Sequence, residues 1–168
     1  MIRRLAVADA EAFRELRHLG LERHPEAFGT GADAWRGPPE AAVAASMGSP
    51  DAPFERFVIG AFEDVRLVGM FGFKRDGRDT LRHKGTCWGL IVHPDHRRRG
   101  HGGALVDAMV AELRGAPGLA YVRIVVTTSP DDALRLFLTH GFVPYGTERG
   151  GLRLGERAYD QSFLRRDL

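Results

Sequence analysis

The stretch from Val92 to Val126 constrains the fold most, because its hydrophobic period changes twice. An apolar run leads up to Val92, and from Gly102 to Leu113 the apolar residues follow the spacing of an amphipathic helix. Glycines at 115 and 118 end that helix. Tyr121 to Val126 (YVRIVV) is rich in β-branched residues, which is typical of a strand buried on both faces. The order strand, helix, strand predicts a βαβ unit with two parallel strands.

The segment before Val92 has the shorter period of β-strands. Short polar turns separate three apolar runs, and this arrangement predicts an antiparallel meander. The three runs are Phe57 to Phe62, Leu67 to Lys74 and His83 to Val92.

The remaining elements follow from hydrophobic period and from residues that break it. Helices are predicted from Asp9 to about Arg23, from Glu40 to Met47 and from Ala133 to His140; strands are predicted for Met1 to Ala6 and for a terminal hairpin, Phe142 to Thr147 and Ala158 to Leu164. Because no internal repeat or low-complexity linker divides the chain, residues 1–168 are interpreted as one α/β domain.

Composition places the chain among globular proteins, with 43% hydrophobic and 27% charged residues. No apolar run approaches the length of a membrane span, and the N-terminus lacks the apolar core of a signal peptide. The single cysteine, Cys87, cannot form an internal disulfide. A cytoplasmic protein without membrane contact is therefore expected.

The segment from Val92 to Gly103 (VHPDHRRRGHGG) combines three features of an anion site. It precedes a helix, whose first N–H groups are unpaired and lie at the positive end of the dipole. Glycines allow close approach of the backbone to a phosphate, and arginines supply cationic side chains. The run Arg97 to Arg99 by itself carries little weight, because 22 of the 24 basic residues are arginine. With a net charge of only +2, nucleic acid is not an expected partner.

This segment resembles the acetyl-CoA loop of the GNAT superfamily of N-acetyltransferases, in which a strand ending in V-x-P is followed by R-x-x-G-x-G. Arg97, Gly100 and Gly102 occupy the motif positions. The stretch from Trp88 to Pro94 resembles the family's fourth strand, and Ala133 to Phe137 with Gly141-Phe142 resembles its fourth helix and following strand.

The resemblance implies a mixed, mostly antiparallel sheet of six to seven strands, flanked by about four helices. Strands four and five would be parallel and splayed, with the cofactor in the gap. Acetyl-CoA would be the co-substrate, with no metal. The residues expected at the cofactor are Leu90, Ile91, Val92, Arg97, Arg98, Arg99, Gly100, His101, Gly102, Gly103, Ala104, Pro130 and Phe137. The backbone at 90–92 would pair with pantetheine, and the N–H groups at 98–103 would meet the pyrophosphate.

The sequence departs from the family pattern where catalysis is concerned. Pro130 replaces a frequent asparagine, and Phe137 replaces the tyrosine that can protonate the departing thiolate. Thr80 to Val92 contains no carboxylate, although many relatives have a glutamate on this strand. The catalytic residues are therefore left unassigned. Glu22 and Glu26 fall in the region that borders the acceptor pocket in this family. They are the candidates to hold or deprotonate the amine of the substrate, and the alternative is that both are surface carboxylates.

The resemblance implies acetyl transfer from acetyl-CoA to a primary amine, by direct attack in a ternary complex. The alternative is a non-catalytic sensor that binds acyl-CoA, which Pro130 and Phe137 favour. The sequence does not identify the acceptor, and a homodimer remains open.

Overall fold

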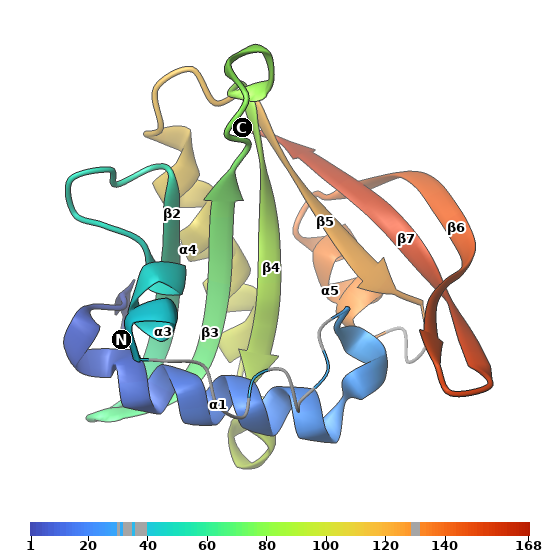
Figure 1. Ribbon diagram of the computed structural model, residues 1–168, viewed down its shortest axis with the longest axis horizontal. Helices are drawn as coiled ribbons and strands as arrows, with labels where there is room; N and C mark the ends of the chain where they lie inside the picture. The colour runs from blue at the N-terminus through green and yellow to red at the C-terminus, as the bar shows by residue number, and fades with distance from the viewer. Residues whose placement is uncertain (30, 32–34, 36–39, 129–131) are drawn as a thin grey trace.

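The computed structural model describes residues 1–29, 31, 35, 40–128 and 132–168. Seven strands form one mixed sheet in the order β1-β2-β3-β4-β5-β7-β6 (Figure 1). The strands are β1 (Ile2–Arg4), β2 (Arg56–Glu63), β3 (Arg66–Arg75), β4 (Lys84–Val92), β5 (Tyr121–Thr127), β6 (Val143–Leu154) and β7 (Arg157–Asp167). The described α-helices are α1 (Ala10–Arg23), α3 (Glu40–Met47), α4 (His101–Arg114) and α5 (Asp132–Thr139).

A short turn connects β2 to β3, and a longer segment with a 3-10 helix at Asp79–Leu81 connects β3 to β4. These strands pair antiparallel as predicted. β5 then pairs parallel with β4, which confirms the βαβ unit around α4. The C-terminal hairpin of β6 and β7 is also confirmed, although β6 extends to Leu154, beyond the predicted end at Thr147.

Two hydrophobic clusters hold the helices on opposite faces of the sheet. One cluster joins α4 and α5 to the sheet, with Leu105, Met109 and Phe137 fully or almost fully buried. The other joins α1 and α3 to β2, β3 and β4, with Phe13 and Val43 at its centre. The helical spacing predicted for α4 is confirmed, because all five of its buried residues are the apolar ones of that stripe.

The prediction that β5 is buried on both faces was wrong. Its burial alternates, and Val125 is 41% exposed. The reason is that the cluster beneath α1 and α3 contains side chains from β2, β3 and β4 but none from β5. One face of β5 therefore lacks a covering helix layer.

Among the described helices, none has an apolar stretch long enough to cross a bilayer.

Candidate functional site

The parallel pair β4 and β5 separates soon after it begins. The strands are in register only from Lys84 to Thr86 on β4 and from Tyr121 to Arg123 on β5. Beyond Thr86 the two strands diverge (Figure 1), and β7 continues to pair with β5 on its other side. The β5-facing backbone of the rest of β4, which includes Leu90 to Val92, therefore has no strand partner. This is the splay that the resemblance implies.

A bulge in β4 lies beside this splay. Met70 pairs with Ile91 and Gly72 with Trp88, so three residue steps on β4 face two on β3. Gly89 takes up the extra residue with a φ of +64°, which few other residues adopt. The bulge turns the backbone of β4 at the position where its pairing with β5 has ended.

The loop between β4 and α4 ends in two residues of left-handed conformation. Arg98 has a φ of +62° and Gly100, the N-cap of α4, a φ of +85°. The first intrahelical hydrogen bond runs from Ala104 N to Gly100 O, at 3.0 Å. The N–H groups of His101, Gly102 and Gly103 precede it and have no helical acceptor. The loop thus presents three backbone donors at the positive end of α4, as an anion site requires.

The three arginines of the loop have different surroundings. Arg97 donates from Nε to Val92 O at 3.1 Å, and its Nη2 lies 2.8 Å from His24 Nε2. Arg99 pairs with Glu63 at 3.3 Å and donates to Asp95 O. Arg98 is exposed. Arg97 and Arg99 thus shape the loop, whereas Arg98 makes no side-chain hydrogen bond or ion pair with the described residues.

Glu63, at the end of β2, ties this loop to the sheet. Its carboxylate lies 2.7 Å from His101 Nε2, 3.0 Å from His96 Nδ1 and 3.3 Å from Arg99 Nη1. The hydrogen bonds from His101 and His96 lower the pKa of Glu63 to about 2. Nothing in the sequence pattern singled out Glu63, because its partners lie more than 30 positions further along the chain.

Glycines 102 and 103 also bring α4 close to α5. A β-carbon on Gly102 would lie 3.3 Å from Leu136 Cδ2, and one on Gly103 would lie 2.9 Å from His140 Nε2. These two glycines therefore serve helix packing, in addition to the phosphate approach that their positions suggest. Around Gly100 there is open space within 4 Å.

The two predicted residues of the fourth family helix have different outcomes. Pro130 lies outside the described residues. Phe137 is 2% exposed, with its ring centroid 5.9 Å from that of Phe71 and 5.1 Å from that of Phe142. Its contact with a cofactor stays a prediction, and the ring itself belongs to the buried core.

Cys87 lies near the position where many relatives have a carboxylate. The side chain is buried, and burial raises the pKa of its thiol well above the ordinary value. A thiol in this state is a poor nucleophile and a poor base at neutral pH.

The two glutamates expected on the acceptor side both lie beside histidines. Glu22 Oε1 is 3.1 Å from His18 Nε2, one helical turn away on α1. Glu26 Oε1 is 3.2 Å from His24 Nδ1, and the other nitrogen of that ring is the one that faces Arg97. His24, which the sequence did not single out, thus connects Glu26 to Arg97 of the loop between β4 and α4. Neutral His24 satisfies both contacts when Nδ1 carries the proton and Nε2 accepts from Arg97.

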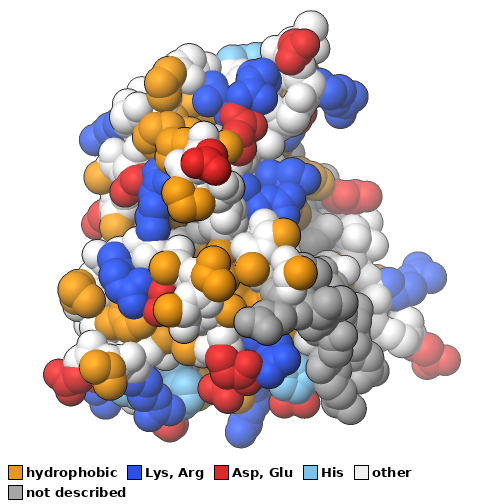
Figure 2. Space-filling view, turned by 60° about the vertical axis from the view of Figure 1, so that its left-hand side comes forward, with side chains coloured by type: hydrophobic (Ala, Val, Ile, Leu, Met, Phe, Trp, Pro, Cys, Tyr) orange, Lys and Arg blue, Asp and Glu red, His pale blue; other side chains and the backbone are white. Residues whose placement is uncertain are grey.

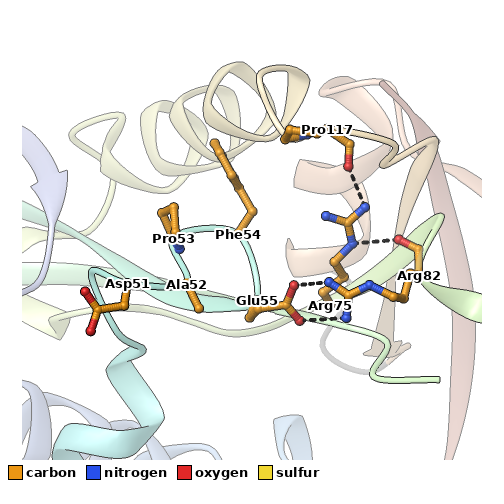
Figure 3. A pocket seen from close by; sticks show the side chains of 8 residues that line it. All are labelled: Asp51, Ala52, Pro53, Phe54, Glu55, Arg75, Arg82 and Pro117. Carbon is orange, nitrogen blue, oxygen red and sulfur yellow. Dashed lines mark hydrogen bonds and ion pairs between the residues drawn. The ribbon is translucent and has the colours of Figure 1, made fainter. Parts of the chain in front are cut away.

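A hollow of about 450 Å³ lies elsewhere, at the opposite end of β3 from the loop (Figure 3). Arg75 donates there to the carbonyl oxygens of Arg82 and Pro117, both at 2.6 Å, and Arg82 pairs with Glu55. The two guanidinium groups in the wall of the hollow are therefore paired with protein acceptors. The hollow lies away from the loop between β4 and α4, so it is not part of the candidate cofactor site.

The described side chains include no group of three or more His, Cys, Asp and Glu arranged to hold a metal ion. On the face that Figure 2 shows, basic and acidic side chains are interspersed.

The comparisons with known proteins agree with this geometry. The model of the acetyltransferase (GNAT) family matches residues 13–142. A GNAT-family acetyltransferase from Streptococcus pneumoniae superposes with a TM-score of 0.82 at 19% identity, over 100% of this chain and 99% of that one. The protein yncA of Salmonella typhimurium, solved with its cofactor acetyl-CoA, gives 0.80 at 20% identity over 99% and 92%.

Ribosomal-protein-alanine N-acetyltransferase from Brucella melitensis gives a TM-score of 0.81 at 17% identity, over 100% of this chain and 99% of that one. At such identities these structures show a shared fold. No curated protein sequence matches the chain. Because the family model covers well over half of the sequence, this chain belongs to the acetyltransferase (GNAT) family.

Proposed function

We propose that the chain transfers the acetyl group of acetyl-CoA to a primary amine within a ternary complex. One observation carries the proposal. β4 loses its pairing with β5 after Thr86, and the loop that follows the same strand ends at a helix start with three N–H groups that lack helical acceptors. A partner-free strand edge suits the amide groups of pantetheine, and a helix start suits a pyrophosphate.

The residues expected at the cofactor have distinct roles in this proposal. The backbone at Leu90 and Ile91 aligns the pantetheine arm, while the carbonyl of Val92 is already occupied by Arg97. The N–H groups of His101, Gly102 and Gly103 receive the pyrophosphate, and Arg98 adds a cation. Ala104 closes the first helical hydrogen bond and so fixes the direction of the donors.

The reaction is a direct displacement. The amine nitrogen forms a bond to the acetyl carbon, the carbon–sulfur bond breaks, and the sulfur leaves as a thiolate. The nitrogen loses one proton and the thiolate takes one, so charge balances. Holding both reactants in one cleft supplies much of the acceleration. A backbone N–H near the β4 bulge polarises the thioester carbonyl. We assign no catalytic acid, because Phe137 has no proton to donate.

The alternative is a sensor that binds acyl-CoA without turnover, and Phe137 is the observation that favours it. Release of free CoA thiol from acetyl-CoA, measured against a panel of primary amines, separates the two functions. Turnover with any amine supports the enzyme. Binding without turnover across the panel supports the sensor.

Acetyl-CoA binding itself is tested by heat denaturation. A ligand at a hundredfold excess over its Kd, bound only to the folded state, adds about 2.7 kcal/mol to the free energy of unfolding. We expect a rise in Tm with acetyl-CoA. An unchanged Tm at millimolar acetyl-CoA would overturn both functions.

A further inference from the structure

Arg17 lies on the buried side of α1, and its guanidinium is held between two tryptophans. The guanidinium carbon is 4.6 Å from the ring centroid of Trp35 and 4.9 Å from that of Trp88. Trp88 in turn lies against Gly72 of β3, where a β-carbon would collide with the indole. Trp35 meets Phe13 edge to face, with centroids 5.8 Å apart. The two rings are therefore held by the core, and the guanidinium lies against both of them.

The polar atoms of this guanidinium are not satisfied. Nε and Nη1 of Arg17 are enclosed, and neither has a hydrogen-bond partner in the described part of the chain. Burial lowers the pKa of Arg17 to about 10, which leaves the group charged at neutral pH. Cation–π contacts compensate only part of the cost of such a buried charge. Buried donors in folded proteins are nearly always paired, so two unpaired ones call for an explanation.

The guanidinium also faces the β4 bulge. A β-carbon on Gly89 would lie 2.9 Å from Nη1 of Arg17, so the glycine leaves room for the cation against the strand backbone. α1 crosses the sheet in front of β3 and β4 (Figure 1), on the face opposite α4 and α5. The unpaired cation therefore lies beside Gly89, next to Leu90, whose backbone is expected to meet the pantetheine arm.

We propose that Arg17 binds a carboxylate carried by the acceptor, so that the acceptor is a small molecule with both a primary amine and a carboxylate. This inference rests on the proposed acetyl transfer. A guanidinium donates strong, charge-assisted hydrogen bonds to a carboxylate. The single positive charge of Arg17, between its two tryptophans, matches the single negative charge of a carboxylate. A phosphate monoester carries nearly two negative charges and matches it less well. With the carboxylate held at Arg17, the amine is presented to β4 beside the bulge.

The test compares each of a panel of α-amino acids with its own carboxamide, which keeps the amine and removes the charge. Acetylation is measured for the wild type, for Arg17→Gln and for Arg23→Gln. Arg23 is the matched control, since it is an exposed arginine in the last turn of the same helix. For the best acceptor we expect kcat/KM to exceed that of its carboxamide roughly 10- to 100-fold, since hydrogen bonds to charged groups contribute that much.

Arg17→Gln is expected to remove this preference while activity on the carboxamide is kept, and Arg23→Gln to leave the preference intact. A purely structural role for Arg17 predicts equal losses on both substrates, and that result would overturn the inference. A wild-type protein that prefers carboxamides, or other amines without a carboxylate, would also overturn the inference. That result can be obtained without any variant.

If no amine is acetylated, the proposed transfer fails by itself. Calorimetric binding of the same pairs to the CoA-loaded protein then decides the inference. Tighter binding of an amino acid than of its carboxamide, lost in Arg17→Gln, supports it. Equal or absent binding of both members throughout the panel overturns it.

Discussion

Gly102 of α4 packs directly against Leu136 of α5, because a β-carbon at position 102 would lie 3.3 Å from Leu136 Cδ2. The first turn of α4 therefore has two neighbours, a helix on one side and the expected pyrophosphate on the other. Absence of a side chain is useful on both sides.

Gly102→Val is expected to abolish acetyl-CoA binding and also to destabilise the protein. The branched side chain would fill the space over the helix start and press on Leu136, and overpacking of this kind costs about 1–3 kcal/mol. Calorimetric titration gives the affinity, and thermal denaturation gives the stability. Gly77→Val is the control, since Gly77 has nothing within 4 Å of its β-carbon position. A folded Gly102→Val protein with unchanged affinity would show that this loop does not hold the phosphates.

Arg98→Gln is expected to weaken acetyl-CoA binding about tenfold and to reduce its salt dependence, since a charge-assisted hydrogen bond contributes about 1.5–3 kcal/mol. Arg98 is exposed and, unlike Arg97 and Arg99, makes no side-chain hydrogen bond or ion pair with the described residues. Titrations at several salt concentrations measure both effects. Arg149→Gln, an exposed change on β6, should alter neither. An affinity that stays at the wild-type value would remove Arg98 from the site.

Much of the fold could be predicted because the hydrophobic period and the residues that end helices and strands indicate the same elements along the chain. α3 has the predicted bounds, and the βαβ unit around α4 follows from alternating strand and helix periods. The exposure of Val125 could not be predicted in this way. It depends on whether a helix from a distant part of the sequence covers that face of β5, and a β-branched composition is the same in either case.

Only part of the candidate site could be predicted from the sequence, for a related reason. The loop from Arg97 to Gly103 is contiguous, so its glycines and arginines are visible as one pattern. Glu63 and Arg17 act through partners far away in the sequence. A signal for Arg17 does exist, since it falls on the same helical stripe as Phe13, Gly20 and Leu21, where a charge is out of place.

Glu63→Gln is expected to lower the thermal stability at neutral pH, because the charge that holds His96, Arg99 and His101 is lost. The pKa of Glu63 is lowered from 4.5 to about 2, so its contribution is fully present above 4.5 and is lost as the pH falls toward 2. The difference in Tm between wild type and Glu63→Gln should therefore shrink in acid. Glu156→Gln, in the exposed β6–β7 turn, should show no such trend. A pH-independent difference would mean that the carboxylate charge is not what holds the loop.

Phe137→Tyr tests whether the missing hydroxyl limits catalysis. The ring of Phe137 is fixed between Phe71 and Phe142, so a tyrosine should keep the same ring position. If the ring edge faces the splay between β4 and β5, the added hydroxyl can protonate the leaving thiolate. General acid catalysis contributes a factor of roughly 10²–10⁴ in rate. The gain appears in kcat only to the extent that departure of the thiolate limits turnover. We expect a higher kcat, with little change in the affinity for acetyl-CoA.

The competing outcome for Phe137→Tyr has a separate signature. A hydroxyl enclosed in the core without a partner costs about 1–3 kcal/mol of stability. A lowered Tm with an unchanged kcat would place the ring edge in the core, because acetyl transfer would then gain nothing from the new group. Phe142→Tyr is the control for a hydroxyl added to the same aromatic cluster, since Phe142 is equally buried and precedes β6. A rise in kcat confined to position 137 would show that Phe137 occupies the place of the family's acid, and that its lack of a proton slows this enzyme.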